Sequence, residues 1–495
     1  MTVLNAQRAA DAGKRGLLLP AYDRSAHGIG IVHIGTGAFF RAHQAAYTDA
    51  ALAAAGGNWR IAAASLRSGS VCAALAGQDH LYTLVTRSET QVGESTARAI
   101  GSIGAVYGPD AGVVALIARM AEPDTRIVTT TVTEKGYGMD RAKGGIDTDH
   151  PDIAHDLRSP AAPRGVIGVI VTALDLRRIN GLPPFTVLCC DNLPNNGPLL
   201  RAAVLAFAGD VSPALAQWIK TYATFPAAMV DRITPAATDA LSQGLHRDFG
   251  YTDAAAVETE AFSQWVIEDS FIAGRPAWDA VGVELVRDVA PYEAMKLRML
   301  NGAHSMLAYA GFMAGKQTVL EVMADPVLSA LVARHMAAAA QTLPPTPGVN
   351  TQAYADRLMQ RFANPNIAHK TYQIAMDGTQ KLPQRIFAPA LCARREGMSL
   401  EPYGFATAAW LFYAQSAASS QSSVVLQDPR ADEITKVVAP TDDAKACVAR
   451  LFSMAAFVPE ELAVSDAFRD AVTRNLVQMR NAGALSAAKT SLARG

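Results

Sequence analysis

The residues with the clearest chemical potential lie on one stretch, Pro291-Tyr-Glu-Ala-Met-Lys-Leu-Arg-Met-Leu-Asn-Gly-Ala-His304. The opening proline and Gly311 near the far end predict a helix of several turns. At ~100° and ~1.5 Å per residue, Lys296 and His304 would lie about 80° apart around the axis and roughly 12 Å apart along it. Asn301 would border the same side. An amine, an amide and an imidazole can together serve a polar substrate, although the same residues also fit a helix with a solvated Lys and a core His.

A glycine-containing stretch, Gly35-Thr-Gly37-Ala-Phe-Phe-Arg-Ala-His43, follows the β-prone run 29–34 and precedes an Ala-rich helical stretch that ends near residue 55. Strand, glycine turn and helix start form a phosphate cradle, because small residues let backbone N–H groups approach a pyrophosphate. Phe40 replaces the third glycine of the fingerprint, so the motif alone equally fits an ordinary turn.

The following strand, 60–66, ends in Arg67-Ser68-Gly69-Ser70. A site for NAD usually places Asp or Glu at this point to bind the ribose hydroxyls, and this sequence has neither. Arg67 can meet the 2′-phosphate of NADP, or it can be a solvated loop residue. The motif therefore leaves the choice of coenzyme open.

Two further strands deliver polar residues at their carboxyl ends. The strand at 126–132 leads into Thr133-Glu-Lys-Gly-Tyr137, and the strand at 185–190 leads into Asp191-Asn-Leu-Pro-Asn-Asn-Gly197. Ligands of open α/β sheets bind at those ends, which makes Glu134 and Asn192 candidates for one pocket. The polar loop that runs to about residue 150 is expected to be surface.

The order of the elements predicts two domains. Alternating strands and helices up to about residue 285 predict an α/β, Rossmann-like dinucleotide-binding domain with a mostly parallel sheet over residues 1–285. From Pro291 onward the periodicity is helical, which predicts a mainly α-helical substrate and catalytic domain over residues 286–495.

Composition narrows the class of partner. The chain has 495 residues, 18% of them charged, and a net charge of -1, which argues against nucleic acid or an anionic membrane. No apolar run approaches the ~20 residues of a membrane span, and the first twenty residues lack the order of a signal peptide. The five cysteines show no metal-ligand spacing. We expect a cytoplasmic, metal-independent enzyme with a small-molecule substrate, monomeric or weakly homo-oligomeric.

Hydride transfer at a carbinol fits these groups. The reaction needs a held nicotinamide, a group that exchanges the hydroxyl proton, and donors that steady the developing alkoxide. Lys296 can exchange the proton only if its pKa falls from ~10.4 toward neutrality, which burial favours. Asn192 and Asn301 can act as an oxyanion hole.

Several motifs resemble one known family. Lys296-Leu-Arg-Met-Leu-Asn-Gly-Ala-His304 resembles the K-x-R-x-L-N-G-x-H signature of the polyol-specific long-chain dehydrogenases, the mannitol dehydrogenase family. Gly35-x-Gly37-x-Phe39-x-Arg41-Ala-His43-Gln44 resembles its N-terminal fingerprint. Its internal blocks resemble Thr133-Glu-Lys-Gly-Tyr137, Cys190-Asp-Asn-Leu-Pro194 and Met229-Val-Asp-Arg-Ile-Thr-Pro235. The resemblance runs from about residue 28 to 390 and is specific, because independent motifs occur in order.

The resemblance implies a dinucleotide domain, a helical C-terminal domain and a cleft between them. It implies Lys296 as general acid/base, Asn192 with Asn301 as the oxyanion pair, His304 as a substrate-holding residue and Glu134 along the proton path. The expected coenzyme-binding residues are Ile34, Gly35, Thr36, Gly37, Ala38, Phe39, Arg41, Arg67 and Asp231. The resemblance favours NAD, whereas Arg67 and Ser68 permit NADP.

The substrate is inferred from finer likeness within the family. Thr133-Glu-Lys-Gly-Tyr137, Leu300-Asn-Gly-Ala-His-Ser-Met-Leu-Ala-Tyr309 and Asp377-Gly-Thr-Gln-Lys-Leu-Pro-Gln-Arg385 resemble the fructuronate reductase branch. The implied reaction is the interconversion of D-fructuronate and D-mannonate. Lys381 and Arg385 would grip the carboxylate from a turn stiffened by Pro383. Oxidation of mannitol, arabinitol or another polyol is the alternative.

Two other classes of protein share part of these motifs. Tyr292-x-x-x-Lys296 matches the Tyr/Lys dyad of short-chain dehydrogenases, in which the tyrosine would carry the proton, but such chains are about half this length. A sugar- or nucleotide-binding regulator without catalysis would be expected to lack part of the Lys296, Asn301 and His304 set, which is complete here.

Overall fold

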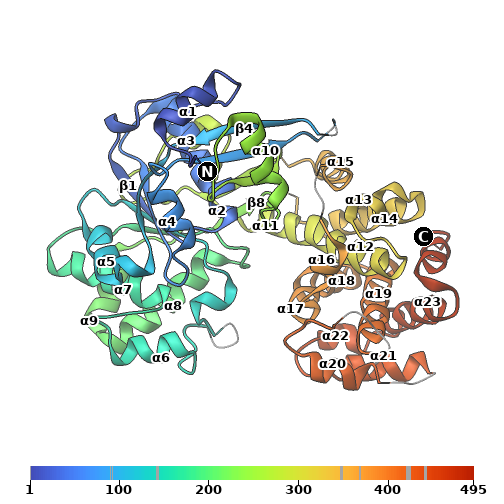
Figure 1. The fold of residues 1–495 in the computed structure, drawn as a ribbon. Coiled ribbons are helices and arrows are strands. Elements are labelled where there is room, and N and C mark those ends of the chain that lie inside the picture. The colour runs from blue at the N-terminus through green and yellow to red at the C-terminus, as the bar shows by residue number, and fades with distance from the viewer. Residues whose placement is uncertain are drawn as a thin grey trace. The chain divides into compact units, whose positions relative to one another are not determined.

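The chain forms two compact units, seen in Figure 1 as the blue-to-green part and the yellow-to-red part. One contains Met1–Ser88 and Gly93–Ala290, and the other contains Glu89–Val92 and Pro291–Gly495. The structure is a computed structural model that describes residues 2–89, 91, 93–140, 144–345, 349–366, 369–419, 425–439 and 443–494.

A five-stranded parallel sheet organises the first unit. Its order is β5 (Ile103–Tyr107), β2 (Arg60–Ala64), β1 (Ile29–Ile34), β6 (Ile127–Thr130) and β7 (Thr186–Cys189). Because β1 and β6 are central neighbours, the loops that follow them leave the same edge of the sheet. The predicted Rossmann-like α/β fold is confirmed.

Both faces of this sheet are buried, as expected of parallel strands connected through helices. Val32 and Ile34 of β1 belong to an apolar core shared with α5 (Val113–Ala121), α7 (Val166–Ile179), α8 (Asn196–Val211) and α9 (Pro213–Tyr222). Ile31, on the opposite face, packs into a second core with α3 (Gln44–Ala55). Figure 1 shows α5, α7, α8 and α9 grouped together.

Two smaller sheets complete the first unit. One has the order β11 (Glu284–Val286), β10 (Gln264–Glu268), β8 (Ala228–Asp231), and the other β4 (Ser95–Ile100), β3 (Tyr82–Arg87), β9 (Val257–Glu260). The remaining helices are α1 (Ala6–Gly13), α2 (Ala38–Ala42), α4 (Ser70–Ala76), α6 (Pro151–Arg158) and α10 (Asp239–Phe249), with single turns η1 (Arg24–Ala26), η2 (Pro109–Ala111), η3 (Glu134–Tyr137) and η4 (Asp279–Val281).

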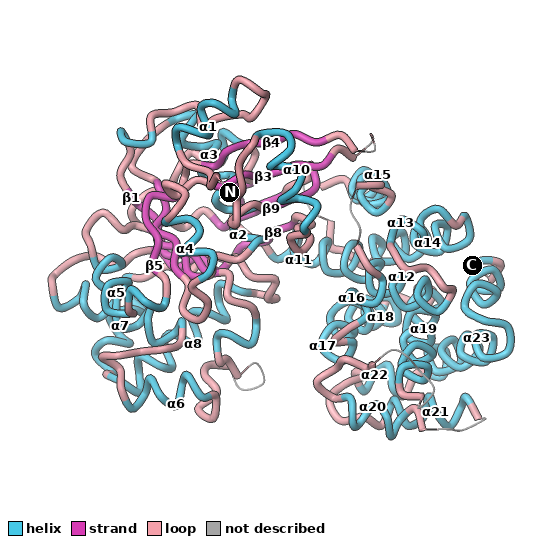
Figure 2. The backbone as a smooth tube through the Cα atoms, in the orientation of Figure 1, coloured by secondary structure: helices cyan, strands magenta, loops and turns pink. Residues whose placement is uncertain are grey.

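The second unit is helical, and Figure 2 shows no strand within its described residues. Its elements are α11 (Ala290–Met295), η5 (Lys296–Asn301), α12 (Gly302–Met313), α13 (Val319–Ala324), α14 (Pro326–Gln341), α15 (Thr351–Phe362), α16 (Thr371–Ala375), α17 (Gly378–Leu382), η6 (Pro383–Phe387), α18 (Ala388–Arg395), α19 (Glu401–Ala417), α20 (Ala431–Val437), α21 (Ala444–Phe452), α22 (Glu460–Ala463) and α23 (Asp466–Leu492). The mainly α-helical C-terminal region is confirmed.

The last helix supports the helix that carries His304. α23 packs along α19, and α19 packs along α12. The approach is close at Gly404, where an added Cβ would lie 2.6 Å from the Cβ of Ala471. The Glu401 carboxylate accepts hydrogen bonds from Asn475 at 2.8 Å and from Ser491 at 3.0 Å. The C-terminal helix α23 thus contributes to the core that supports α12.

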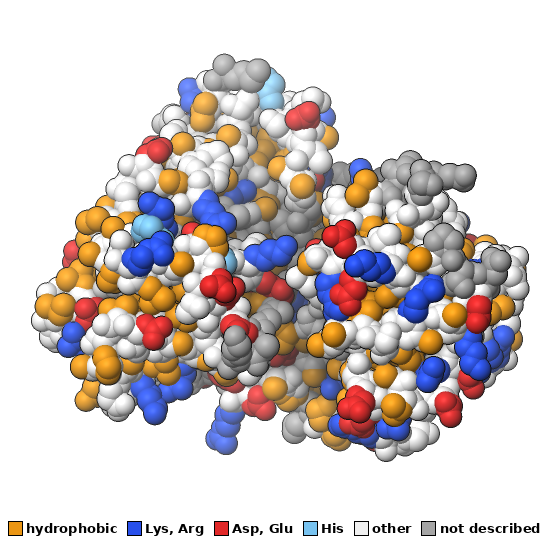
Figure 3. All heavy atoms as spheres, turned by 90° about the horizontal axis from the view of Figure 1, so that it is seen from below, with side chains coloured by type: hydrophobic (Ala, Val, Ile, Leu, Met, Phe, Trp, Pro, Cys, Tyr) orange, Lys and Arg blue, Asp and Glu red, His pale blue; other side chains and the backbone are white. Residues whose placement is uncertain are grey.

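The surface carries both signs of charge. On the face in Figure 3, Lys and Arg side chains are interspersed with Asp and Glu. This distribution agrees with a net charge of -1. Among the described residues no helix has the length and apolar character that a bilayer span requires.

The turn after β1 depends on Gly35. Its φ is +114°, and an added Cβ would lie 2.1 Å from the carbonyl oxygen of Thr131. Gly37 differs, because its φ is -62° and no heavy atom lies within 4 Å of an added Cβ. The first glycine is therefore required by conformation and by packing against the loop after β6, and the second is not.

We expect Gly35→Ala to lower the free energy of unfolding by at least about 2 kcal/mol, since it combines an unfavourable φ with a backbone clash. Gly37→Ala is the matched control and should change stability by no more than about 0.5 kcal/mol. Urea unfolding followed by circular dichroism measures both. Equal effects would show that the turn does not depend on Gly35.

Candidate functional site

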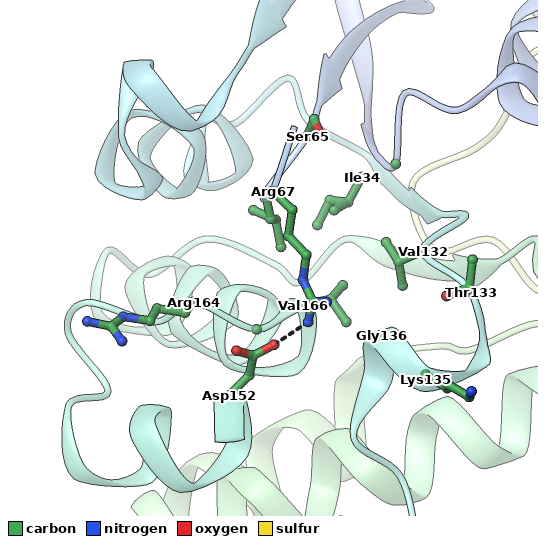
Figure 4. A pocket seen from close by; sticks show the side chains of 13 residues that line it. Ile34, Ser65, Arg67, Val132, Thr133, Lys135, Gly136, Asp152, Arg164 and Val166 are labelled. Atoms are coloured by element: carbon green, nitrogen blue, oxygen red, sulfur yellow. Dashed lines mark hydrogen bonds and ion pairs between the residues drawn. The ribbon is translucent and has the colours of Figure 1, made fainter. Parts of the chain in front are cut away.

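A cavity of about 210 Å³ opens at the carboxyl ends of β1, β2 and β6 (Figure 4). This is the edge at which open α/β sheets bind ligands. Its lining residues are Ile34, Gly35, Ser65, Leu66, Arg67, Val132, Thr133, Lys135, Gly136, Asp152, Arg164, Gly165 and Val166.

The residues of this cavity fit a dinucleotide. Gly35 keeps its wall free of a side chain next to the end of β1, and its positive φ is the conformation that a tight turn after a strand requires. The cations Arg67, Lys135 and Arg164 line the cavity and can offset phosphate charge. A nicotinamide dinucleotide bound here would supply or accept a hydride.

The predicted coenzyme residues fall into two groups. Ile34, Gly35 and Arg67 line the cavity. Arg41 is buried and donates to the backbone carbonyl of Thr36, so in this structure it braces the turn. The other predicted residues do not line a described cavity: Gly37 and Ala38 begin α2, Phe39 stacks on His43, and Asp231 ends β8 and is buried.

His33 holds the same turn and was not predicted. Its Nε2 lies 2.9 Å from the carbonyl oxygen of Gly35, and its Nδ1 lies 2.7 Å from the hydroxyl of Thr129. A carbonyl can only accept, so Nε2 donates and Nδ1 accepts. The ring stacks on Phe40 at 3.7 Å, and burial lowers the pKa of His33 to about 3. A neutral imidazole therefore fixes the glycine turn.

Asp191 ties together the loops that carry Glu134 and Asn192. Its carboxylate accepts the N–H groups of Val132 at 2.9 Å and Thr133 at 3.1 Å, and the hydroxyl of Tyr137 at 2.6 Å. Burial raises the pKa of Asp191, and these donors counter only part of that increase. Glu134 lies in η3 and Asn192 follows Asp191 directly, so both leave the same edge of the sheet.

The stretch around Lys296 is helical, as predicted, but not uniformly α-helical. η5, from Lys296 to Asn301, is a π-helix with i→i+5 hydrogen bonds, inserted between α11 and α12. A wider turn rotates each residue by less than the 100° of an α-helix, so the angular spacing calculated from regular geometry is wrong. Lys296 and His304 are buried, with 6% and 8% of their surface exposed.

A second π-helix, η6, packs against the first. The close point is Gly302, where an added Cβ would lie 2.8 Å from the carbonyl oxygen of Arg385 and 3.2 Å from Nε2 of His335. The expected turn around Pro383 is wrong: the chain is helical from Gly378 to Arg395. Proline fits here because its φ of -54° is helical, and its carbonyl accepts the N–H of Ala388.

His304 is surrounded by aromatic rings and cations. Its ring stacks on Phe362 at 4.9 Å and meets the edge of His369 at 4.8 Å. Nε2 of His304 has no hydrogen-bond partner among the described residues. Burial holds the pKa of His304 well below 6.5, and His369, Arg385, Arg361 and Lys381 lower that pKa further. A neutral imidazole nitrogen is thus placed to bind a hydroxyl.

The two predicted carboxylate-binding residues lie in this unit. Lys381 donates to the carbonyls of Ile374 at 3.2 Å and Met376 at 2.6 Å, so it also closes the loop before α17. Arg385 donates to the hydroxyl of Ser305 at 3.1 Å, next to His304. Arg361 and His369 complete the surroundings of His304 and were not predicted, because neither belongs to a motif that was singled out.

In the described part of the chain, no three His, Cys, Asp or Glu residues lie together in a group that could hold a metal ion.

Two family models match most of the chain. Residues 29–280 match the mannitol dehydrogenase Rossmann domain, and residues 288–480 match the mannitol dehydrogenase C-terminal domain. The two matches together cover more than half of the sequence, and each falls almost entirely in one of the two compact units.

Named relatives differ in their substrates. D-mannonate oxidoreductase of Escherichia coli (strain K12) is 40% identical, covering 94% of this chain and 96% of the relative. A mannitol 2-dehydrogenase of Phaeosphaeria nodorum is 39% identical, covering 85% of this chain and 75% of the relative. Pseudomonas fluorescens mannitol 2-dehydrogenase, solved as a ternary complex with NAD and D-mannitol, has a TM-score of 0.88 at 38% identity and covers 99% of this chain and 100% of that one.

Four largely buried histidines predict the pH dependence of stability. Burial lowers the pKa to about 3 in His33 and to about 4 in His335 and His369, and well below 6.5 in His304. The unfolded chain therefore binds more protons than the folded one from about pH 4 to about pH 6.5. Stability should fall as pH decreases through this window, by up to about 1.4 kcal/mol per pH unit for each histidine.

The measurement is chemical unfolding of the protein at pH 7.5, 6.5 and 5.5. His335→Asn isolates the cause: it should weaken the pH dependence even if it lowers stability at pH 7.5. If this substitution leaves the change of unfolding free energy with pH as it is, the assignment of a neutral His335 is contradicted.

Proposed function

The chain belongs to the mannitol dehydrogenase family, and we propose that it interconverts D-fructuronate and D-mannonate with NAD as the hydride carrier. Oxidation of a CH–OH group, or reduction of the corresponding carbonyl group, is the activity of the family. The substrate and coenzyme assignments rest on the chemistry of the second unit, the cavity of the first unit, and likeness to D-mannonate oxidoreductase.

The observation that carries the proposal is the cationic setting of His304. Arg361, Lys381 and Arg385 lie near enough to act on its charge, and they do so within a largely buried region. A neutral ketose supplies no charge to offset such a cluster. A sugar acid brings a carboxylate, which Arg385 can hold with two charge-assisted hydrogen bonds.

The proton step is assigned to Lys296. In reduction, a hydride is added to the keto carbon while Lys296 gives a proton to the carbonyl oxygen, which becomes the hydroxyl of mannonate. In oxidation the same amine takes the hydroxyl proton back. Glu134 is assigned to the proton path that restores Lys296, and His304 to holding a substrate hydroxyl.

Asn192 and Asn301 are assigned to the developing alkoxide. Each offers a neutral amide donor, and a lost donor of this kind usually costs ~10²–10³-fold in kcat. Asn192 lies in the first unit and Asn301 in the second.

Lys296→Ala tests the proton step. Because general acid–base groups contribute ~10²–10⁴-fold, kcat should fall by at least about 100-fold while NADH still binds. Lys316→Ala is the matched control, since Lys316 contacts Asp325 at 3.6 Å and has no assigned role. Tyr292→Phe distinguishes this mechanism from the Tyr/Lys dyad, in which the tyrosine would carry the proton. It should leave kcat nearly unchanged. If kcat collapses in Tyr292→Phe while Lys296→Ala keeps its activity, the tyrosine and not the lysine is the group that exchanges the proton.

Arg385→Met tests the carboxylate. Losing a charge-assisted contact of ~1.5–3 kcal/mol should lower kcat/KM for D-fructuronate by roughly 10- to 150-fold and leave D-fructose turnover nearly unchanged. Arg395→Met is the control, because Arg395 is exposed and pairs with Glu461 at the surface. Lys381→Met should show the same selectivity with some loss on both substrates, since Lys381 also closes a loop. If Arg385→Met lowers kcat/KM equally for D-fructuronate and D-fructose, Arg385 has a structural role and does not bind the carboxylate.

A neutral polyol is the second candidate. Mannitol 2-dehydrogenases match this chain at nearly the same identity, and a solved one shares its fold over almost the whole length. The hydride and proton chemistry would be unchanged, and only the contacts beyond the carbinol would differ.

A further inference from the structure

Two residues that line the dinucleotide cavity, Arg67 and Asp152, form an ion pair. Nη2 of Arg67 lies 2.7 Å from Oδ2 of Asp152, and Figure 4 shows the two side chains extending toward each other across the cavity. Arg67 comes from the loop after β2, whereas Asp152 lies in the first turn of α6, 85 residues further along the chain. Asp152 is mostly buried, with 24% of its side chain exposed.

The pair lies where two cavities meet. A neighbouring cavity of about 390 Å³ shares Arg67, Asp152 and Arg164 with the first. Its lining also includes Tyr107, Val113 and Leu116, which offer an apolar surface suited to a flat ring. Together the two cavities place cationic and apolar residues around the Arg67–Asp152 pair.

The location corresponds to the ribose of the adenosine half. In dinucleotide-binding sheets, an acid at the end of the second strand binds the 2′- and 3′-hydroxyls, and this chain has Arg67-Ser68 at that point instead. Resting on the dinucleotide part of the proposed function, we infer that Asp152 replaces that acid from α6 and selects NAD over NADP.

Charge explains the direction of selection. The Asp152 carboxylate has acceptor positions beyond the one that Arg67 uses, and a ribose diol can donate to them. A 2′-phosphate carries no comparable donors and would lie beside a carboxylate of like charge. It would also have to compete with Asp152 for Arg67. The arginine that would otherwise favour NADP is thereby held by an acid that disfavours it.

Neighbouring contacts fix the position of Asp152. The Asp156 carboxylate, one turn further along α6, accepts the N–H groups of Arg164 at 2.7 Å and Gly165 at 2.8 Å. Gly165 packs so closely that an added Cβ would lie 3.0 Å from the Cβ of Asp152. The loop between α6 and α7 therefore holds α6 against the cavity.

The test measures binding without any sugar substrate or nicotinamide. ADP-ribose and 2′-phospho-ADP-ribose are titrated into the full-length protein by isothermal titration calorimetry. The unaltered protein should bind ADP-ribose at least about 10-fold more tightly. Asp152→Asn should reduce that ratio of affinities roughly 10- to 100-fold, the effect of one charge-assisted contact. The variant should bind ADP-ribose more weakly and 2′-phospho-ADP-ribose more tightly. Asp149→Asn, an exposed acid just before α6, controls for net charge and should leave the ratio unchanged.

Loss of the same factor for both ligands in Asp152→Asn, or an unaltered protein that prefers 2′-phospho-ADP-ribose, would overturn the inference. If Asp152→Asn does not fold, Arg67→Ala decides the question. With the acid still in place, that variant should keep or increase the preference for ADP-ribose, and equal binding of the two ligands would contradict the role of Asp152. A wrong sugar substrate would leave all these affinities as expected, so the two proposals fail separately.

Discussion

The contact at Gly302 is the constraint on which the chemistry proposed for the second unit depends. Gly302, the first residue of α12 directly after the π-helix η5, reaches the Arg385 carbonyl of the π-helix η6, with no room for a side chain. The packing sets Lys296 and Asn301 on η5 and Arg385 on η6 relative to each other. Irregular helical turns of this kind are common at functional sites, because they redirect side chains without breaking the helix. The core of α12, α19 and α23 supports them from behind.

The first unit reaches the same end by different means. Its candidate functional groups lie on loops at one edge of a parallel sheet, and buried polar side chains hold those loops. His33 fixes the glycine turn, Asp191 joins the loops after β6 and β7, and Asp156 holds the loop between α6 and α7. Each supplies hydrogen bonds that the backbone of a loop cannot make for itself. Preorganised loops are what a coenzyme and a reacting carbonyl both require.

The sequence was informative where local pattern and local structure agree. The apolar run 29–34 and the glycine after it predicted β1 and its turn, and the helical periodicity after Pro291 predicted the second unit. The family was recognised from motifs, and the matched domains confirm it. The π-helices were missed because they depend on a tertiary contact between distant segments. Asp152 was missed because it follows a polar loop interpreted as surface, and only the fold brings it to Arg67.

The central claim is that the cationic surroundings of His304 select a sugar acid. The most direct test is kcat/KM of the unaltered protein for D-fructuronate and for D-fructose, followed by NADH absorbance at one pH and ionic strength. We predict a preference for D-fructuronate of at least about 10-fold, the effect of one charge-assisted contact to its carboxylate. Equal values, or a preference for D-fructose, would contradict the account.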